Sequence, residues 1–238
     1  MKVFILAGGL GTRLKSLTNN QPKVMIKIGD KPILEHLVNL CVKHNFTDII
    51  ISLFHLPKPV TQYFGNGKKL HARISYSIET KPMGGAGAIK YAEPLLKDDS
   101  FFVLNGDVMT CANLTKIAQF HQQKQGLATF LVHKTDHPYD SDLVEFDNND
   151  LITKFFRPQK GDKFKPTSKT GTHIFEPEVL DFIPPDIKYS LEKQLIPDLL
   201  KQGKKLYAYY SNEYSKDMGT SQRLTQVRKD FKDGKITI

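Results

Sequence analysis

Apolar residues along this chain fall into short continuous runs and into stretches with helical spacing, and the two patterns alternate. Runs rich in β-branched and aromatic residues predict buried strands at 3–6, 49–53 and 101–104. Further strands are expected at 73–78 and 128–132, and helices at about 32–41, 84–96 and 114–123. Strands that alternate with helices favour an α/β fold with a mostly parallel sheet and helices on both faces.

The pattern changes near Lys134, where short strands with polar turns replace the alternation. We expect strands at 143–146, 152–156, 172–175 and 206–210, a mobile loop at 160–168, and helices starting at Pro177, Ser190 and Ser221. The chain has no internal repeat and no linker rich in Pro, Gly or Ser. It therefore predicts a single domain over 1–238, with halves of about 1–133 and 134–238.

Composition narrows the class of protein. The 238 residues carry a net charge of +9, but the cationic residues are scattered and form no basic helix or strip that would indicate nucleic-acid binding. Small phosphorylated partners fit this charge better. No apolar run approaches the roughly 18 residues of a membrane span, and no signal peptide is expected at the start. Cys41 and Cys111 indicate neither a disulfide framework nor a metal cluster, which favours the cytoplasm.

A glycine-rich loop follows the first predicted strand and carries the clearest chemistry. Its sequence is Gly8-Gly9-Leu10-Gly11-Thr12-Arg13, with Pro22-Lys23 after it. Main-chain N–H groups and a guanidinium suit an anion with several oxygens, such as a triphosphate. The P-loop pattern does not fit, because Arg13-Leu14 replaces Lys-Ser/Thr. The dinucleotide pattern does not fit either, because Leu14 stands where a third glycine is needed.

The loop and four later segments resemble the sugar-1-phosphate nucleotidylyltransferases, in the order of that family. The later segments are Glu79-Thr80-Lys81-Pro82-Met83-Gly84-Gly85-Ala86-Gly87-Ala88, Leu104-Asn105-Gly106-Asp107, Gly171, and Asp217-Met218-Gly219-Thr220. The resemblance implies a Rossmann-like mixed sheet (the nucleotide-diphospho-sugar transferase fold) with a small β-rich sugar-binding subregion. It also implies a reaction in which a sugar 1-phosphate attacks a nucleoside triphosphate and pyrophosphate leaves.

The resemblance also assigns roles to residues. Arg13, Lys23 and Asp107 would be catalytic, and Asp107 with Asp217 would hold Mg²⁺. The nucleotide would bind at Leu6, Ala7, Gly8, Gly9, Gly11, Thr12, Arg13, Glu79, Pro82, Gly84 and Gly106. The sugar phosphate would bind at Val144, Arg157, Gly171, Glu192 and Lys193. Taken one at a time, these residues could equally be surface charges, turns or close packing.

Glu79 bears on the choice of base, since in relatives this position faces it. A carboxylate only accepts hydrogen bonds, and guanine offers two adjacent donors, so GTP is favoured. Tyr189-Ser190-Leu191-Glu192-Lys193 resembles a segment of the short bacterial heptose-1-phosphate guanylyltransferases. Heptose 1-phosphate is therefore the first expectation, mannose 1-phosphate the second, and N-acetylmuramic acid 1-phosphate with UTP the third.

Several positions depart from the family pattern on the sugar side. Phe156-Arg157-Pro158 replaces Glu-Lys-Pro, Ser141-Asp142-Leu143-Val144 replaces Tyr-Gly-x-Val, and Gly85 replaces a threonine. Two other classes stay open, a non-catalytic sensor of nucleotide sugars and a glycosyltransferase of similar sheet. The sensor predicts loss of the charged residues, which are present, and the glycosyltransferase leaves the glycine loop unexplained. The sequence does not indicate an oligomeric state.

Overall fold

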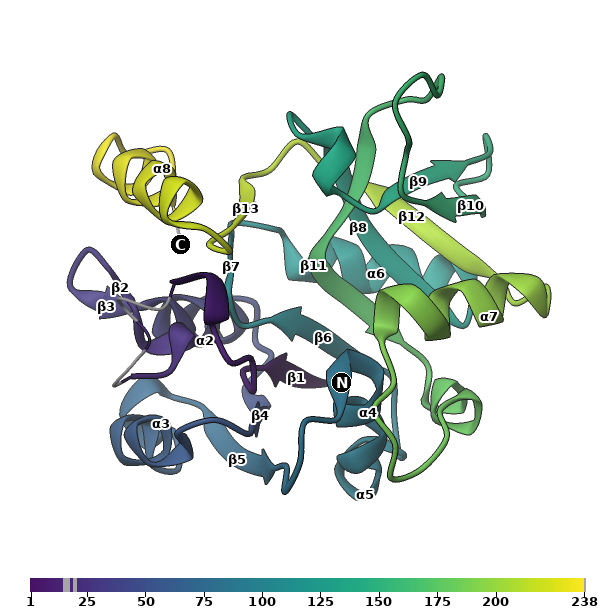
Figure 1. Cartoon of the computed structure of the whole chain (residues 1–238). Helices are drawn as coiled ribbons and strands as arrows, with labels where there is room; N and C mark the ends of the chain where they lie inside the picture. The colour runs from purple at the N-terminus through teal and green to yellow at the C-terminus, as the bar shows by residue number, and fades with distance from the viewer. Residues whose placement is uncertain (15–17, 19–20, 238) are drawn as a thin grey trace. The chain divides into compact units, whose positions relative to one another are not determined.

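The computed structural model describes residues 1–14, 18 and 21–237, and these form two compact units (Figure 1). The first unit comprises Met1–Pro82, Val103–Asn113 and Glu213–Ile238, and the second comprises Met83–Phe102 and Leu114–Asn212. The chain passes repeatedly from one unit to the other, so neither is continuous in sequence. The boundary expected near residue 133 lies inside the second unit, and the single domain over 1–238 stays a prediction.

The first unit is built on parallel strands in the order β6-β1-β4-β5. Val3 of β1 lies opposite Ile49 of β4, and Ile49 lies opposite Ile74 of β5. Its strands are β1 (Lys2–Leu6), β2 (Lys27–Ile28), β3 (Lys31–Pro32), β4 (Asp48–Leu53), β5 (Arg73–Ile78), β7 (Val108–Thr110), β13 (Ser215–Asp217) and most of β6 (Phe101–Asn105). Its helices are α2 (Ile33–Lys43), α3 (Pro57–Phe64) and α8 (Ser221–Lys232), with 3-10 turns at Thr12–Leu14, Lys23–Met25 and Lys68–Leu70.

Burial explains why these segments form strands. Val3, Phe4 and Ile5 are inaccessible to solvent, as are Ile49 and Ile51 of the neighbouring strand. A continuous apolar run, rather than an alternating one, is what a parallel strand covered on both faces requires. The predictions at 3–6, 49–53, 73–78 and 101–104 are confirmed.

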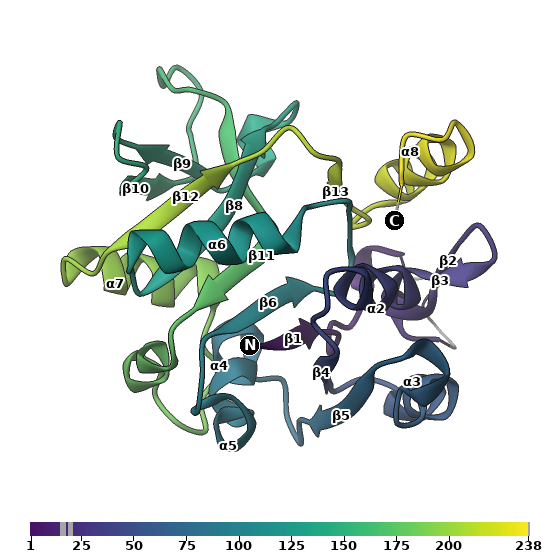
Figure 2. The ribbon, with the colours of Figure 1, turned by 180° about the vertical axis from the view of Figure 1, so that it is seen from behind.

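The second unit combines antiparallel and parallel pairings. β11 pairs with both β9 and β8 in antiparallel fashion, β9 pairs with β10, and β12 lies parallel to β8. Its strands are β8 (Ala128–Lys134), β9 (Leu143–Phe146), β10 (Ile152–Phe156), β11 (Thr167–Phe175) and β12 (Leu206–Tyr210). Its helices are α4 (Gly84–Tyr91), α5 (Glu93–Leu96), α6 (Leu114–Lys124) and α7 (Ile196–Lys201), with 3-10 turns at Pro138–Asp140 and Pro177–Phe182 and a π-helical turn at Leu191–Leu195. Figure 2 shows α6 lying against β8 and β12.

Three expectations need correction. The helix expected over 84–96 is two helices, because Pro94 has no N–H to donate and its ring collides with the preceding turn. The last long strand begins at Thr167 rather than residue 172, so the expected loop at 160–168 ends earlier. A register shift between Lys169 and His173 interrupts the alternation that would have indicated this strand.

Four short strands, β2, β3, β7 and β13, were not anticipated. Each has two or three residues, too few for hydrophobic periodicity to be read. β13 and β7 matter for the site, because they pair antiparallel with Asp217 opposite Val108. Among the described residues, no helix is long and apolar enough to cross a membrane.

Candidate functional site

The glycine-rich loop begins where β1 ends, directly after Leu6. The N–H of Ala7 donates to the carbonyl of Ser52 at 2.9 Å, which fixes the loop to the end of β4. Gly11 has φ +62°, and a Cβ there would lie 2.9 Å from Thr18 Cγ2. A Cβ at Gly9 would meet nothing within 4 Å, so this part of the loop faces open space. The main chain is therefore accessible to a ligand where the sequence predicts phosphate binding.

Glu79 lies against the same loop. It follows β5, is only 8% exposed, and its Oε1 accepts a hydrogen bond from the hydroxyl of Ser52 at 2.8 Å. A Cβ at Gly8 would come within 3.2 Å of that same Oε1. The structure thus brings together the loop and the carboxylate that the sequence places at the base, although 70 residues separate them.

Asp107 and Lys23 form an ion pair with Nζ 2.5 Å from Oδ2. Asp107 comes just after β6, where the N–H of Gly106 donates to the carbonyl of Leu6 at 2.9 Å. A Cβ at Gly106 would lie 2.8 Å from that carbonyl oxygen, so the close approach of the two chains requires glycine. The Lys23 side chain is 10% exposed and reaches Asp107 from the turn Lys23–Met25. Two of the three residues predicted to be catalytic are therefore in contact.

Asp217 is placed beside Asp107 by the pairing of β13 with β7. The N–H of Met218 donates to the Asp107 carbonyl at 2.8 Å. The Asp217 carboxylate accepts from Arg223 Nη1 at 3.1 Å through both oxygens and from the N–H of Gly219 at 2.7 Å. Sequence reasoning missed Arg223, because its six-residue separation from Asp217 is no recognised motif.

Arg13 reaches the same place from the glycine loop. A Cβ at Gly219 would lie 3.0 Å from Arg13 Nη2 and 2.6 Å from Asp217 Oδ1, so the absence of a side chain there lets the guanidinium and the carboxylate approach each other. Arg13, Lys23, Asp107 and Asp217 are thus gathered within the first unit. This clustering is what separates the functional interpretation from that of scattered surface charges.

The donor set suits a magnesium ion that also binds phosphate. Asp107 and Asp217 are partly exposed, at 34% and 30% of their side chains. Among the described residues there is no group of three or more His, Cys, Asp or Glu side chains that could enclose a metal. Mg²⁺ commonly binds through one or two carboxylates, with substrate phosphates and water as its other ligands. Two carboxylates in contact with solvent fit that requirement.

The remaining residues predicted to bind nucleotide lie where the chain leaves the first unit. Pro82 is the last residue of the first stretch of that unit, and Gly84 begins α4 in the second. Gly84 has φ +73°, and a Cβ there would lie 2.8 Å from the carbonyl oxygen of Tyr189. The N–H groups of Ala86 and Gly87 donate to this carbonyl. Close packing therefore accounts for Gly84, and also for Gly87, where a Cβ would lie 2.8 Å from the carbonyl oxygen of Ile187.

Residues predicted to bind the sugar phosphate belong to the second unit and differ in their surroundings. Arg157 is 56% exposed and donates from Nε and Nη2 to Asp142 Oδ1, at 3.2 and 3.0 Å. Val144 is buried in β9, and Lys193 is exposed. Gly171 lies in β11 within the stretch where the register shifts.

Glu192 has a partner that sequence reasoning did not name. Its Oε1 lies 2.9 Å from Nζ of Lys169, a buried lysine on β11. Lys169 stands two residues before Gly171, and since the strand is expected from the sequence to begin only at residue 172, no sequence pattern indicated this contact.

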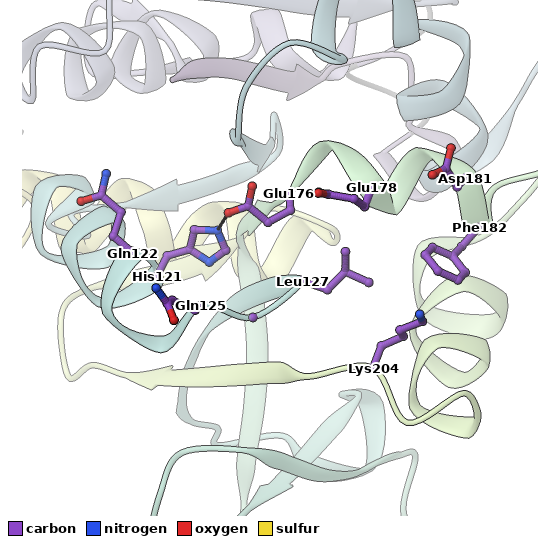
Figure 3. Close-up of a pocket in the computed structure, with 10 residues that line it drawn as sticks. His121, Gln122, Gln125, Leu127, Glu176, Glu178, Asp181, Phe182 and Lys204 are labelled. Atoms are coloured by element: carbon purple, nitrogen blue, oxygen red, sulfur yellow. Dashed lines mark hydrogen bonds and ion pairs between the residues drawn. The ribbon is translucent and has the colours of Figure 1, made fainter.

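A separate pocket of about 780 Å³ lies in the second unit (Figure 3). His121 is buried at one side of it, with Nδ1 2.8 Å from Thr129 Oγ1 and Nε2 2.9 Å from Glu176 Oε1. Burial lowers the pKa of His121, against the opposing effect of Glu176. Glu178 and Asp181 add carboxylates along the rim. None of the residues that the sequence analysis assigned to a site lines this pocket.

A known protein family matches nearly the whole chain. Residues 2–234 match the family model described as nucleotidyl transferase. A UTP–glucose-1-phosphate uridylyltransferase of Synechocystis is 34% identical in an alignment 222 positions long, which covers 87% of this chain and 57% of the relative. A mannose-1-phosphate guanyltransferase of Kluyveromyces lactis is 34% identical in an alignment 243 positions long, gaps included, which covers 99% of this chain and 64% of the relative. The chain thus spans about three fifths of the length of these relatives.

Solved structures show the same fold. The crystal structure of HddC from Yersinia pseudotuberculosis has a TM-score of 0.82 at 26% identity and covers 97% of this chain and 99% of that one. A UDP-glucose pyrophosphorylase complexed with UDP-glucose has a TM-score of 0.85 at 17% identity and covers 98% of each chain. These matches confirm the predicted α/β fold of the nucleotide-diphospho-sugar transferases. The chain belongs to the nucleotidyl transferase family.

Proposed function

We propose that this chain transfers a nucleotidyl group from a nucleoside triphosphate to a sugar 1-phosphate. A phosphate oxygen of the sugar attacks the α-phosphorus, a new P–O bond forms, and the bond to pyrophosphate breaks. The observation that carries the proposal is the contact of Lys23 with Asp107, beside Asp217 and Arg13 and next to the open glycine loop. Relatives named as uridylyltransferase and guanyltransferase support the same reaction class.

The attacking oxygen is already anionic, so the reaction needs little general-base catalysis. Catalysis rests on in-line positioning and on neutralisation of charge that develops on the leaving group. In this proposal the loop amides from Gly9 to Thr12 and the Arg13 guanidinium hold the β- and γ-phosphates. Lys23 lies against the α-phosphate or the sugar phosphate, where a compact ammonium can follow the moving charge.

Asp107 and Asp217 would hold the magnesium ion. When bound there, Mg²⁺ would neutralise phosphate charge and polarise the phosphorus that is attacked. Lys23 and Arg223, which contact these carboxylates, then compete with the ion for the same oxygens. This competition fits a metal that arrives with the triphosphate rather than one held permanently.

GTP is the triphosphate we propose, and heptose 1-phosphate is the first sugar substrate, for cell-surface polysaccharide synthesis. Support for guanine comes from the buried, acceptor-only Glu79 beside the loop and from mannose-1-phosphate guanyltransferases among the relatives. HddC has also been crystallised in complex with GMP-PN. Mannose 1-phosphate is the second candidate sugar, and N-acetylmuramic acid 1-phosphate with UTP is the third. A cytoplasmic location stays a prediction.

The test is pyrophosphate release from a grid of four nucleoside triphosphates and several sugar 1-phosphates, each with Mg²⁺. We expect one pairing to dominate. Asp107→Asn and Asp217→Asn should each lower turnover by at least about a hundredfold, through loss of metal-held charge stabilisation. The matched control is Asp181→Asn, which removes an exposed carboxylate in the separate pocket and should leave turnover at the wild-type rate. Wild-type rates in both Asp107→Asn and Asp217→Asn would refute the metal assignment.

The grid also separates the other two classes. A non-catalytic sensor would bind a nucleotide sugar but release no pyrophosphate under any pairing. A glycosyltransferase would consume a nucleotide sugar in the presence of an acceptor and would likewise release none. Either result would end the nucleotidyltransferase proposal.

A further inference from the structure

Lys169 is a lysine almost removed from solvent. Its side chain is 7% exposed, and its Nζ lies 2.9 Å from Glu192 Oε1. An ammonium with no partner in such a place would carry a large desolvation cost, which the contact with the carboxylate offsets. Glu192 is the more exposed member of the pair, at 31%. The lysine therefore lies behind the carboxylate, and the carboxylate faces outward.

Both ends of this pair are fixed by hydrogen bonds. The N–H of Lys169 donates to the carbonyl of Asp142, which ties this part of β11 to the start of β9. Glu192 lies in the π-helical turn Leu191–Leu195, where the hydroxyl of Ser190 caps the N–H of Lys193 at 3.2 Å. The N–H of Ser190 donates in turn to Gln194 Oε1. The backbone that carries each member of the pair is therefore held in place.

Two other charged groups near the turn contact residues other than Glu192. On α4, which packs against the turn, Lys90 is paired with Glu93 and donates to the carbonyl of Leu180. On α7, Asp198 accepts from the hydroxyl of Tyr189 at 2.5 Å. Lys193 is exposed. Lys169 is thus the cation that the described residues place on Glu192.

The state of the carboxylate follows from this arrangement. Burial alone would raise the pKa of Glu192, but the charge and hydrogen bond of Lys169, with help from Ser190, hold it below its ordinary value. A buried ion pair is often no more stabilising than apolar residues of the same volume, so stability alone does not explain why this one is present.

We propose that Lys169 is a positioning residue for the sugar 1-phosphate, which fixes the Glu192 carboxylate as the hydrogen-bond acceptor for a sugar hydroxyl. This inference rests on the proposed function and extends it, because Lys169 belongs to none of the residues that the family resemblance assigns. Since Glu192 Oε1 is bound to Lys169, Oε2 is the oxygen that remains for the sugar; its contact with the hydroxyl of Ser190 is long, at 3.5 Å. The acceptor selects sugars that carry a hydroxyl at the matching position.

The experiment measures KM for the sugar 1-phosphate in Lys169→Met, Lys169→Arg, Glu192→Gln and the double variant Lys169→Met/Glu192→Gln. Each KM is divided by that of wild type, from about pH 8.5 to about pH 5.5, so that titration of the sugar phosphate itself cancels. Lys201→Met removes an exposed lysine of α7 and is the matched control. Circular dichroism checks that each variant is folded. If Lys169→Met does not fold, the test is made with Lys169→Arg.

We expect Lys169→Met to raise KM for the sugar phosphate about tenfold or more at the acid end, with kcat and the KM for the triphosphate nearly unchanged. Without the lysine, burial raises the pKa of Glu192, so the carboxylate takes up a proton as the pH falls and ceases to be a pure acceptor. The penalty should therefore shrink as the pH rises. Lys169→Arg should restore part of the loss, Glu192→Gln should show a penalty independent of pH, and the double variant should be no worse than Glu192→Gln.

Two results would overturn the inference. One is a Lys169→Met enzyme with the same KM as Lys201→Met at every pH. The other is a penalty that does not depend on pH and adds fully to that of Glu192→Gln, which would indicate only a structural role.

A binding measurement keeps the two proposals separate. Calorimetry compares a nucleotide sugar with its nucleoside diphosphate, using the product of the dominant pair, or GDP-mannose with GDP if no pair turns over. Lys169→Met should weaken binding of the nucleotide sugar and leave the diphosphate unchanged. If the wild type releases no pyrophosphate but binds GDP-mannose more tightly than GDP, the proposed function is refuted and the effect of Lys169→Met on this preference still tests the Lys169 inference. If the wild type binds GDP-mannose and GDP equally, the Lys169 inference is refuted as well.

Discussion

His173 offers a stability prediction that can be worked through from its surroundings. It lies on β11 with no exposed surface, and within the part of the chain that the structure describes neither ring nitrogen has a hydrogen-bond partner. Its ring packs 5.0 Å from that of Phe130 and 6.2 Å from that of Phe175, between centroids. Burial, with the nearby charge of Lys169, holds the pKa of His173 well below its ordinary value. We therefore predict that His173→Leu stabilises the protein, and does so most in acid.

The magnitude has two parts. Removing an unsatisfied buried polar group stabilises the protein by about 1–3 kcal/mol, and losing the ring contacts destabilises it by about 0.5–1.5 kcal/mol. The net stabilisation by His173→Leu near pH 8 should therefore be about 1 kcal/mol. Below the ordinary histidine pKa, the unfolded chain binds a proton that the folded chain does not. The free energy of unfolding of the wild type therefore decreases as the pH is lowered. Between about pH 8 and about pH 5.5 this loss comes to about 1.4 kcal/mol. The advantage of His173→Leu should thus grow to about 2.4 kcal/mol.

Urea unfolding, followed by circular dichroism and tyrosine fluorescence, measures this advantage at each pH. Taking the difference between variant and wild type cancels the titration of all other groups. His55→Leu, at a half-exposed position in the first unit, is the control for replacing a histidine that is not fully enclosed. If His173→Leu is no more stable than wild type near pH 8, and the difference does not widen toward pH 5.5, the reasoning from the unpaired ring is wrong.

Two further predictions concern the first unit. Glu79→Gln can still accept from Ser52 but presents an amide to the base, so kcat/KM for GTP relative to UTP should fall about tenfold, and an unchanged ratio would remove the argument for guanine. Gly219→Ala places a Cβ 2.6 Å from Asp217 Oδ1 and 3.0 Å from Arg13 Nη2. It should lower kcat about tenfold or more with little loss of thermal stability. Turnover at the wild-type rate would show that the positions of Arg13 and Asp217 around Gly219 do not affect catalysis.

Much of the fold could be predicted from local pattern. The strands at 3–6, 49–53 and 73–78 are apolar enough, or alternate clearly enough, to be predicted. The helical segment expected from Ser190 is also present, and the Ser190 hydroxyl accepts from the N–H of Lys193. The interleaving of the two units could not be predicted, because it depends on which distant segments pair. β7 and β13 are three residues each and exist only because they pair with each other.

The candidate site divides in the same way. Glycines, Arg13, Lys23 and the two aspartates could be identified because they stand in motifs with fixed spacing. The contacts that bring them together could not, since Gly106 against the Leu6 carbonyl and Met218 against the Asp107 carbonyl join segments about one hundred residues apart. Arg223 was missed for the same reason, although it holds both oxygens of Asp217.

The departures from the family pattern and the contacts in the structure both concern which residues bind the sugar phosphate. Where relatives carry Glu-Lys-Pro, this chain has Phe156-Arg157-Pro158, and Arg157 is exposed and bonded to Asp142. Arg157 keeps the positive charge of the family lysine, and its role in phosphate binding stays a prediction, whereas Phe156 removes a carboxylate acceptor. Another cation of this unit, Lys169 on β11, has a side chain that is only 7% exposed and contacts Glu192; β11 pairs with β9, which pairs with β10. The carboxylate acceptor missing at Phe156 is thus matched, two strands away, by Glu192 in contact with Lys169, as the proposed sugar contact requires.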